Sequence, residues 1–100
     1  MIDLTKLVVH CKEQPYDIYI GRPSVYGNPF SHKPGTLAKY KVNTQLEAVE
    51  YYGEWLWRQD KLLKKIREEL RGKILGCWCK SRRTPNAPCH GDVIVYVANL

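Results

Sequence analysis

The sequence has no apolar stretch long enough to cross a membrane. Its longest uncharged apolar run is Val93–Leu100, whereas a helix that spans a bilayer needs about 20 apolar residues. The first residues, Met1–Lys6, include an acid and are followed by no apolar core of the kind that a signal peptide carries. We therefore expect a cytoplasmic protein without a membrane span.

Repeats and low-complexity segments are also missing. The 100 residues are 44% hydrophobic, 11% aromatic and 26% charged, which is the composition of a folded globular chain rather than a disordered one. A chain of this length is usual for a single hydrophobic core. We expect one domain over residues 1–100.

Acidic residues are scarce beside basic ones. Ten Asp and Glu stand against sixteen Lys and Arg, which gives a formal net charge of +6. Such a charge favours an anionic partner, either a nucleic acid or a phosphorylated small molecule. A basic run on and after the second predicted helix is usually a solvated helix face, although it could contact nucleic acid. Its members are Lys61, Lys64, Lys65, Arg67, Arg71 and Lys73.

Cysteine is the one reactive residue type that is clustered. Three of the four cysteines, Cys77, Cys79 and Cys89, lie within thirteen residues. Without a secretory signal, the reducing cytosol favours free thiols over disulfides. Cys77 and Cys79 on one face of a strand are also poorly placed for a bridge. We expect no disulfide among these three cysteines.

Three segments have strand composition and two have helical periodicity. A further segment, Asp92–Leu100, fits a helix or a strand, and we expect a helix because Asp92 suits a helix N-terminus. The predicted strands are Lys6–Cys11, Tyr16–Ile20 and Lys73–Cys79, and the predicted helices begin at Thr44, Asp60 and Asp92. The first helix is expected to bury Leu46, Val49, Gly53, Leu56 and Trp57, and the second Leu62, Leu63, Ile66 and Leu70. Together they predict an α+β fold, a three-layer-like small α/β domain. In it, a short sheet of about three strands is packed by two central helices and a C-terminal helix.

Two segments rich in glycine and proline, Gly21–Gly35 and Lys80–Gly91, are predicted to be loops. The first loop carries Arg22, Ser24 and Asn28, which can donate to or accept from a ligand, while its glycines let backbone N–H groups approach. We expect these three residues to bind a ligand. The alternative is a structural Ω-loop held by its prolines.

The second loop carries the stronger signal, because Gly76–Cys79 precedes it and Pro88–Asp92 ends it. If a helix follows, its N-terminal N–H groups attract an anion and lower the pKa of a nearby thiol. The residues expected to bind the anion here are Cys79, Lys80, Arg82, Arg83, His90, Gly91 and Asp92. The alternative is that the cysteines are small core residues and the arginines belong to a solvated loop.

A zinc site is a second interpretation of the same residues. Cys77, Cys79, Cys89 and His90 are zinc ligand types. Their spacing, Cys-x-Cys and adjacent Cys-His, differs from the usual zinc knuckle, and the two cysteines of the strand face one metal only if its end curls. We therefore expect no metal and no cofactor.

A catalytic role would need a nucleophile and a base. The candidates are Cys77 or Cys89 as a thiolate, His90 as an acid or base, and Asp92 as the residue that orients it. Adjacent helical residues point about 100° apart. We therefore expect Cys77 to pair with His90 better than Cys89 does. The sequence leaves open whether the protein is an enzyme.

Together, Ile20–Phe30, Leu75–Cys79 and Pro88–Val93 resemble the two signatures, Gly-Arg-x-Ser-x-x-Gly-Asn-Pro-Phe and Gly-Cys-Trp-Cys with Cys-His-Gly-Asp, of a family of small bacterial and phage proteins. That family is known only as a domain of unknown function. The resemblance extends from Val8 to Asn99. It implies a compact α+β domain whose recurrent polar features are the two loops, and it implies no activity.

Pairing the two loops leads to the functional prediction. If both loops lie at one edge of the sheet, Arg22 lies within reach of His90 in one basic pocket of Cys, His and Asp residues. We expect this pocket to bind a phosphorylated, nucleotide-like small molecule, so that a phage protein sequesters or degrades a host nucleotide signal. A second subunit could complete the pocket. The alternatives are a zinc-stabilised or basic nucleic-acid-binding module, and a small hydrolase or transferase.

Overall fold

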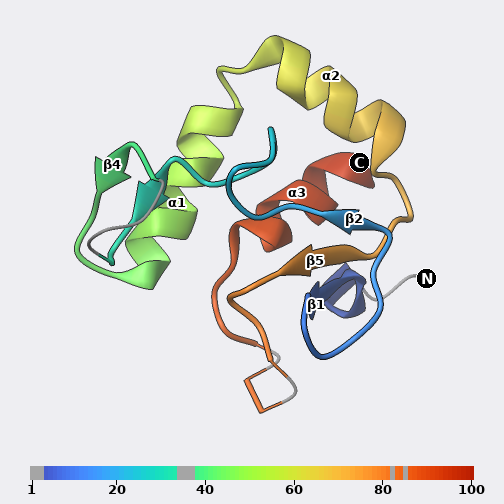
Figure 1. The fold of residues 1–100 in the computed structure, drawn as a ribbon. Coiled ribbons are helices and arrows are strands. Elements are labelled where there is room, and N and C mark those ends of the chain that lie inside the picture. Colours follow the sequence, from blue (N-terminus) through green and yellow to red (C-terminus); the bar gives the residue numbers. More distant parts are fainter. Residues whose placement is uncertain (1–3, 34–37, 82, 85) are drawn as a thin grey trace.

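The structure, a computed structural model, describes residues 4–33, 38–81, 83–84 and 86–100. It has an α+β fold with three α-helices and short parallel strands (Figure 1). In chain order the elements are a 3-10 helix Leu4–Leu7, β1 Val8–His10, β2 Ile18–Tyr19, β3 Phe30–Ser31, β4 Tyr40–Lys41, α1 Gln45–Leu56, α2 Asp60–Glu69, β5 Leu75–Cys77 and α3 His90–Ala98. Among the described residues, no helix has the length and apolar character needed to span a membrane.

The main sheet has three parallel strands in the order β1-β5-β2. Strand β1 pairs with one side of β5, from Val8 opposite Leu75 to His10 opposite Cys77, and β2 pairs with the other side. All three strands therefore end at the same edge of the sheet. The carboxyl edge of a parallel sheet is a common position for ligand sites.

Helix α3 forms the centre of the core. It contacts α1, α2 and β1, and Figure 1 shows it between the sheet and the other two helices. Its buried residues are His90, Gly91, Ile94, Val95, Val97 and Ala98. A helix this apolar over most of its surface is stable only inside a core. The structure confirms the C-terminal helix that the sequence predicts.

The buried face of α1 differs from the prediction. Ala48, Tyr52 and Leu56 are buried, whereas Leu46 and Trp57, which were expected in the core, are 55% and 56% exposed. The buried residues repeat every four positions and include Tyr52, whose hydroxyl donates a hydrogen bond of 3.0 Å to the carbonyl oxygen of Tyr26. A tyrosine whose hydroxyl is hydrogen-bonded can be fully buried. Tyr52 therefore faces the core, and the buried side of α1 is rotated from the side that the aliphatic residues indicate.

The helix boundaries are close to those that the sequence predicts. Thr44 caps α1 by accepting a hydrogen bond from the backbone of Glu47, as expected. Asp60 is the first residue of α2 rather than its cap, which is Gln59. The second helix still ends before Gly72, whose φ of 72° is a conformation that favours glycine.

The strands are shorter than predicted, and two were not predicted. The 3-10 helix takes up the first part of the segment Lys6–Cys11, which leaves only three residues for β1. Strand β3 lies inside the segment predicted to be a loop, where it pairs in parallel with β4. A two-residue strand has too few positions to show an alternating pattern, so the sequence could not indicate this second sheet.

Glycine at position 91 allows α3 to approach the sheet closely. A Cβ atom there would lie 2.8 Å from Ile20 Cδ1 and 2.8 Å from Val8 Cγ1. We predict that Gly91→Ala lowers the free energy of unfolding by about 1–2 kcal/mol, because overpacking outweighs the better helix propensity of alanine. The free energy is measured by urea unfolding.

Gly53→Ala in α1 is the matched control, because a Cβ atom there meets only Val93 Cγ2, at 4.0 Å. This substitution should raise the free energy of unfolding by up to about 1 kcal/mol. Equal stabilisation by both substitutions would contradict the close packing of α3 on β1 and β2.

Candidate functional site

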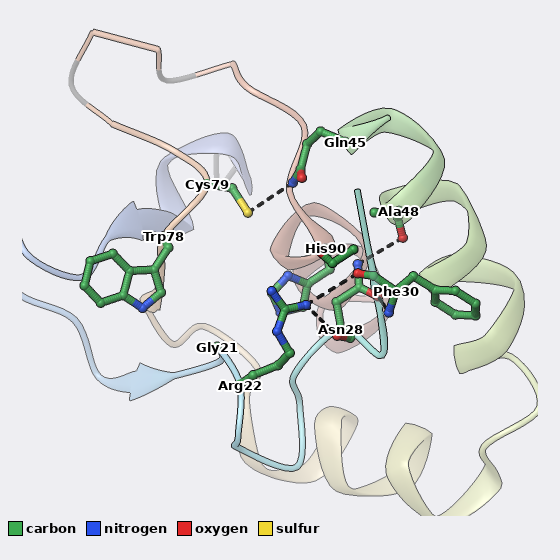
Figure 2. A pocket seen from close by; sticks show the side chains of 10 residues that line it. Gly21, Arg22, Asn28, Phe30, Gln45, Ala48, Trp78, Cys79 and His90 are labelled. Carbon is green, nitrogen blue, oxygen red and sulfur yellow. Dashed lines mark hydrogen bonds between the residues drawn. The ribbon is translucent and has the colours of Figure 1, made fainter. Parts of the chain in front are cut away.

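The two polar loops meet at one cavity at the carboxyl edge of the main sheet (Figure 2). Its volume is about 70 Å³. It is lined by Gly21, Arg22, Asn28, Phe30, Ser31, Gln45, Ala48, Trp78, Cys79 and His90. Arg22 and His90 are therefore on the wall of one cavity, as the pairing of the loops predicts.

Arg22 is the one permanently charged side chain on the described wall of the cavity. Its Nη1 atom donates to the carbonyl oxygens of Asn28, at 2.8 Å, and Phe30, at 3.4 Å. No carboxylate among the described residues pairs with it, and the donors on Nε and Nη2 are not used by these hydrogen bonds. Two backbone carbonyls thus orient a guanidinium group that can still hold an anion.

Asn28 and Ser24 do not have the roles that the sequence suggests. The Asn28 side chain is buried, donates to the carbonyl oxygen of Ala48 and accepts from the backbone N–H of Phe30, both at 2.9 Å. It lines the cavity, but its amide is committed to joining the loop to α1. Ser24 lies outside this cavity, in a neighbouring groove that Arg22 and Asn28 also line.

His90 is buried, and its two ring nitrogens face different partners. Its Nε2 atom lies 2.8 Å from the carbonyl oxygen of Ile20. A carbonyl oxygen can only accept, so Nε2 carries the proton and Nδ1 has the free lone pair. Nδ1 faces the Cys89 sulfur at 3.8 Å. Burial lowers the pKa of His90, which keeps the ring neutral at physiological pH.

The thiols of Cys77, Cys79 and Cys89 form one cluster, and all are free. Hydrogen bonds with Cys79 and then Cys89 lower the pKa of Cys77. The interaction with Cys77 raises the pKa of Cys79 to about 11, and it is also the main cause of the raised pKa of Cys89. Deprotonation of Cys77 is therefore favoured over that of Cys79 and Cys89.

The expected separation of Cys89 and His90 is wrong. Cys89 has φ −148° and ψ 142°, because it is the N-cap of α3 rather than a helical residue. The angle of about 100° between neighbours applies only within the helix, so these adjacent side chains can meet. Contrary to the prediction that Cys77 pairs better with His90, the sulfur that contacts the imidazole at 3.8 Å is that of Cys89.

Lys80 and Asp92 form an internal ion pair rather than a ligand site. The Lys80 side chain is 5% exposed, and its Nζ atom lies 3.1 Å from Asp92 Oδ1 and 2.9 Å from the carbonyl oxygen of Ala87. Asp92 also accepts from the backbone N–H of Cys89, which completes a capping box for α3. This pair holds the second loop against the helix that follows it.

Two further predicted residues, Gly91 and Arg83, are not on the described wall of the cavity. Gly91 is buried against β1 and the end of β2, and Arg83 is exposed and not on the cavity wall. Arg82 lies outside the described residues. Anion binding at the start of α3 is therefore not supported by these positions.

Two residues that shape the rim were not among the predicted binding residues. Trp78 is 56% exposed, and its Nε1 atom donates to the Tyr19 hydroxyl at 2.7 Å. That hydroxyl lies 3.3 Å from the carbonyl oxygen of Arg22, to which it donates. Gln45 contributes a donor from the start of α1, at 3.2 Å from Cys79 Sγ. The alternation of Trp78 with Cys77 and Cys79 along the predicted strand places its side chain on the other face, whereas nothing in the sequence marks Gln45.

We predict that Asp92→Asn lowers the free energy of unfolding by about 2 kcal/mol. The substitution leaves the buried Lys80 ammonium without its carboxylate, and the loss is smaller than the 3–5 kcal/mol of a fully buried pair because Asp92 is 41% exposed. Glu68→Gln, which breaks an exposed pair with Lys64, is the control and should cost about 0.5 kcal/mol or less. Equal effects in urea unfolding would show that the Lys80 pair is no more than a surface pair.

Comparison with known proteins gives a family and no activity. Residues 6–100 match the family described as Domain of unknown function (DUF4326). Neither a curated protein nor a solved structure matches the chain. The matched range includes both polar loops, all three α-helices and the whole described wall of the cavity. The chain therefore belongs to the family Domain of unknown function (DUF4326).

Proposed function

We propose that the protein binds a small phosphorylated, nucleotide-like molecule, with the phosphate beside Arg22. The observation that carries this proposal is a guanidinium group without a carboxylate partner among the described residues, on the wall of a cavity that contains no described acid. An arginine held by two backbone carbonyls is preorganised for an anion.

The size of the cavity defines which part of the ligand enters it. Its volume is about 70 Å³, whereas a cavity of about 10–15 Å³ is enough to hold one water molecule. The cavity thus accommodates a group of a few atoms, such as a phosphate, and the rest of a nucleotide would lie outside. A phosphate there would also meet the buried hydroxyl of Ser31.

Trp78 offers a surface for the base outside the cavity. Its indole is more than half exposed, and base stacking on an aromatic side chain is worth about 1–3 kcal/mol. His10 packs edge-on against the ring at 5.4 Å between centroids, and Lys12 Nζ lies 5.8 Å from its centre. These contacts fix the indole and add positive charge to the rim.

The geometry favours holding the ligand over degrading it. Cys77 and Cys89 are 0% exposed, so neither sulfur can reach a ligand in the cavity without rearrangement. His90 uses Nε2 to bind the Ile20 carbonyl and directs Nδ1 at Cys89. A general base needs a free nitrogen facing the substrate, which the His90 imidazole does not offer.

Nucleic-acid binding has less support. The basic residues of α2 and the turn after it are exposed, and two of them, Lys64 and Lys65, pair with Glu68 and Glu69. They form a solvated helix face, and the cavity residues are not among them. The cytoplasmic location belongs to our proposal, because a reducing compartment maintains free thiols. A phage origin and a host nucleotide signal as ligand stay predictions.

We predict that adenosine monophosphate and inorganic phosphate, each in large excess, raise the melting temperature by about 5 °C or more. Adenosine, which has no phosphate, should not do so. Arg22→Gln should weaken phosphate binding roughly tenfold or more, because it removes a charge-assisted hydrogen bond worth about 1.5–3 kcal/mol. Titration calorimetry gives the dissociation constants.

Arg67→Gln is the matched control, because it removes the same charge from the exposed side of α2. It should leave phosphate binding unchanged. If both substitutions weakened binding equally, the chain would attract anions by its net charge alone, and the Arg22 cavity would not be the site. A cyclic dinucleotide tested in the same way reports whether a phosphodiester is accepted.

We also predict that a bound nucleotide is recovered intact after prolonged incubation, because the candidate nucleophiles Cys77 and Cys89 are buried and His90 is engaged at both nitrogens. Chromatography of adenosine monophosphate and of a cyclic dinucleotide, with and without the protein, checks this. Breakdown that depends on protein concentration would support the hydrolase alternative instead.

A further inference from the structure

Three sulfurs and one ring nitrogen converge next to the cavity. The ligand atoms of Cys79, Cys89 and His90 all lie within 4.8 Å of one another. Cys77, which is buried at the end of β5 two residues before Cys79, is the candidate for a fourth ligand, and the thiols of Cys79 and Cys89 influence its pKa. Three thiols and a neutral imidazole form a donor set that is typical of structural zinc sites.

The local backbone explains how such unusual spacing can bring four ligands together. Strand β5 ends at Cys77, and Trp78 and Cys79 lie in a bend after it, so the two cysteines are not held to opposite ends of a straight strand. Cys89 is an extended N-cap residue beside the helical His90. Both departures from the usual zinc-knuckle spacing are therefore compensated by the fold.

Two of the sulfurs accept a hydrogen bond from an N–H group. Gly91 donates to Cys89 Sγ at 3.3 Å, and Gln45 Nε2 donates to Cys79 Sγ at 3.2 Å. Donors directed at sulfur stabilise thiolates, and such outer partners orient the ligands of metal sites.

The orientation of His90 matches that of a metal ligand. A metal-binding histidine commonly donates its second ring N–H to a backbone carbonyl, which fixes the tautomer. His90 Nε2 donates in this way to the carbonyl oxygen of Ile20 at 2.8 Å. The lone pair of Nδ1 is thereby directed toward the sulfurs, and the ring is only 6% exposed.

We propose that Cys77, Cys79, Cys89 and Nδ1 of His90 bind one Zn²⁺ ion in a tetrahedral structural site. This departs from the absence of metal that the spacing alone suggests. Binding releases the thiol protons to solvent, and four protein ligands leave no position for a substrate on the ion. The proposal does not depend on ligand binding at Arg22.

The first test uses the full chain purified without chelator. Elemental analysis by mass spectrometry should find one zinc ion per chain. Iodoacetamide applied to the native protein should label Cys11 and spare the other three cysteines, and a strong chelator should expose all four. Chelation should also lower the melting temperature by about 10 °C or more, and added Zn²⁺ should restore it.

Variants locate the ion. Cys79→Ser should lose the zinc, whereas Cys11→Ser, at the one cysteine outside the cluster, should retain it. If Cys79→Ser does not fold, Co²⁺ substitution in the unaltered chain still tests the proposal. Tetrahedral thiolate ligation should produce intense visible and sulfur-to-cobalt charge-transfer bands.

Four results would each overturn the proposal. The first is a folded, zinc-free chain in which all four cysteines react with iodoacetamide. The second is a chain mass that is lower by two hydrogen atoms, which indicates a disulfide. The third is iron or copper in place of zinc, and the fourth is zinc retained by folded Cys79→Ser. Absence of phosphate binding to a zinc-loaded chain would reject the proposed function alone, so the two proposals fail separately.

Discussion

The hydrogen bond from His90 Nε2 to the carbonyl oxygen of Ile20, 2.8 Å long, joins the end of β2 to the start of α3. Because both groups are buried, neither can exchange its partner for water, and breaking the bond would leave a costly unsatisfied polar pair. The bond places the loop that follows Ile20, and with it Arg22, against the cysteine cluster. It also fixes the ring so that Nδ1 faces Cys89. Both proposed sites depend on this one contact.

The parts of the fold that the sequence predicts well are those with a strong period or a required backbone conformation. Helix α2 buries Leu62, Ile66 and Leu70 as its periodicity indicates, and Gly72 ends it with a positive φ. The predicted core-facing side of α1 was wrong because a tyrosine, Tyr52, fills the interior there. The β3-β4 pair was missed because a two-residue strand has too few positions to show an alternating pattern.

The site was predictable as two segments but not as an arrangement of side chains. Composition indicated that the glycine-rich loop and the cysteine-histidine segment carry polar chemistry, and the structure brings both to one cavity. Composition alone could not distinguish the roles of these two cations. Arg22 lacks a carboxylate partner among the described residues, whereas Lys80 forms an ion pair with Asp92. That difference depends on which carboxylate the folded chain brings near each cation. The number of charged residues in the sequence does not show which of them pair.

The charge of the proposed zinc centre bears on anion binding next to it. Zn²⁺ with three thiolates and a neutral imidazole has a net charge of about −1, which would oppose an anion in the cavity. The ion would also fix Cys79 and His90, two residues of the cavity wall. The attraction for phosphate then comes from Arg22, and the contribution of the cluster is to hold the shape of the cavity.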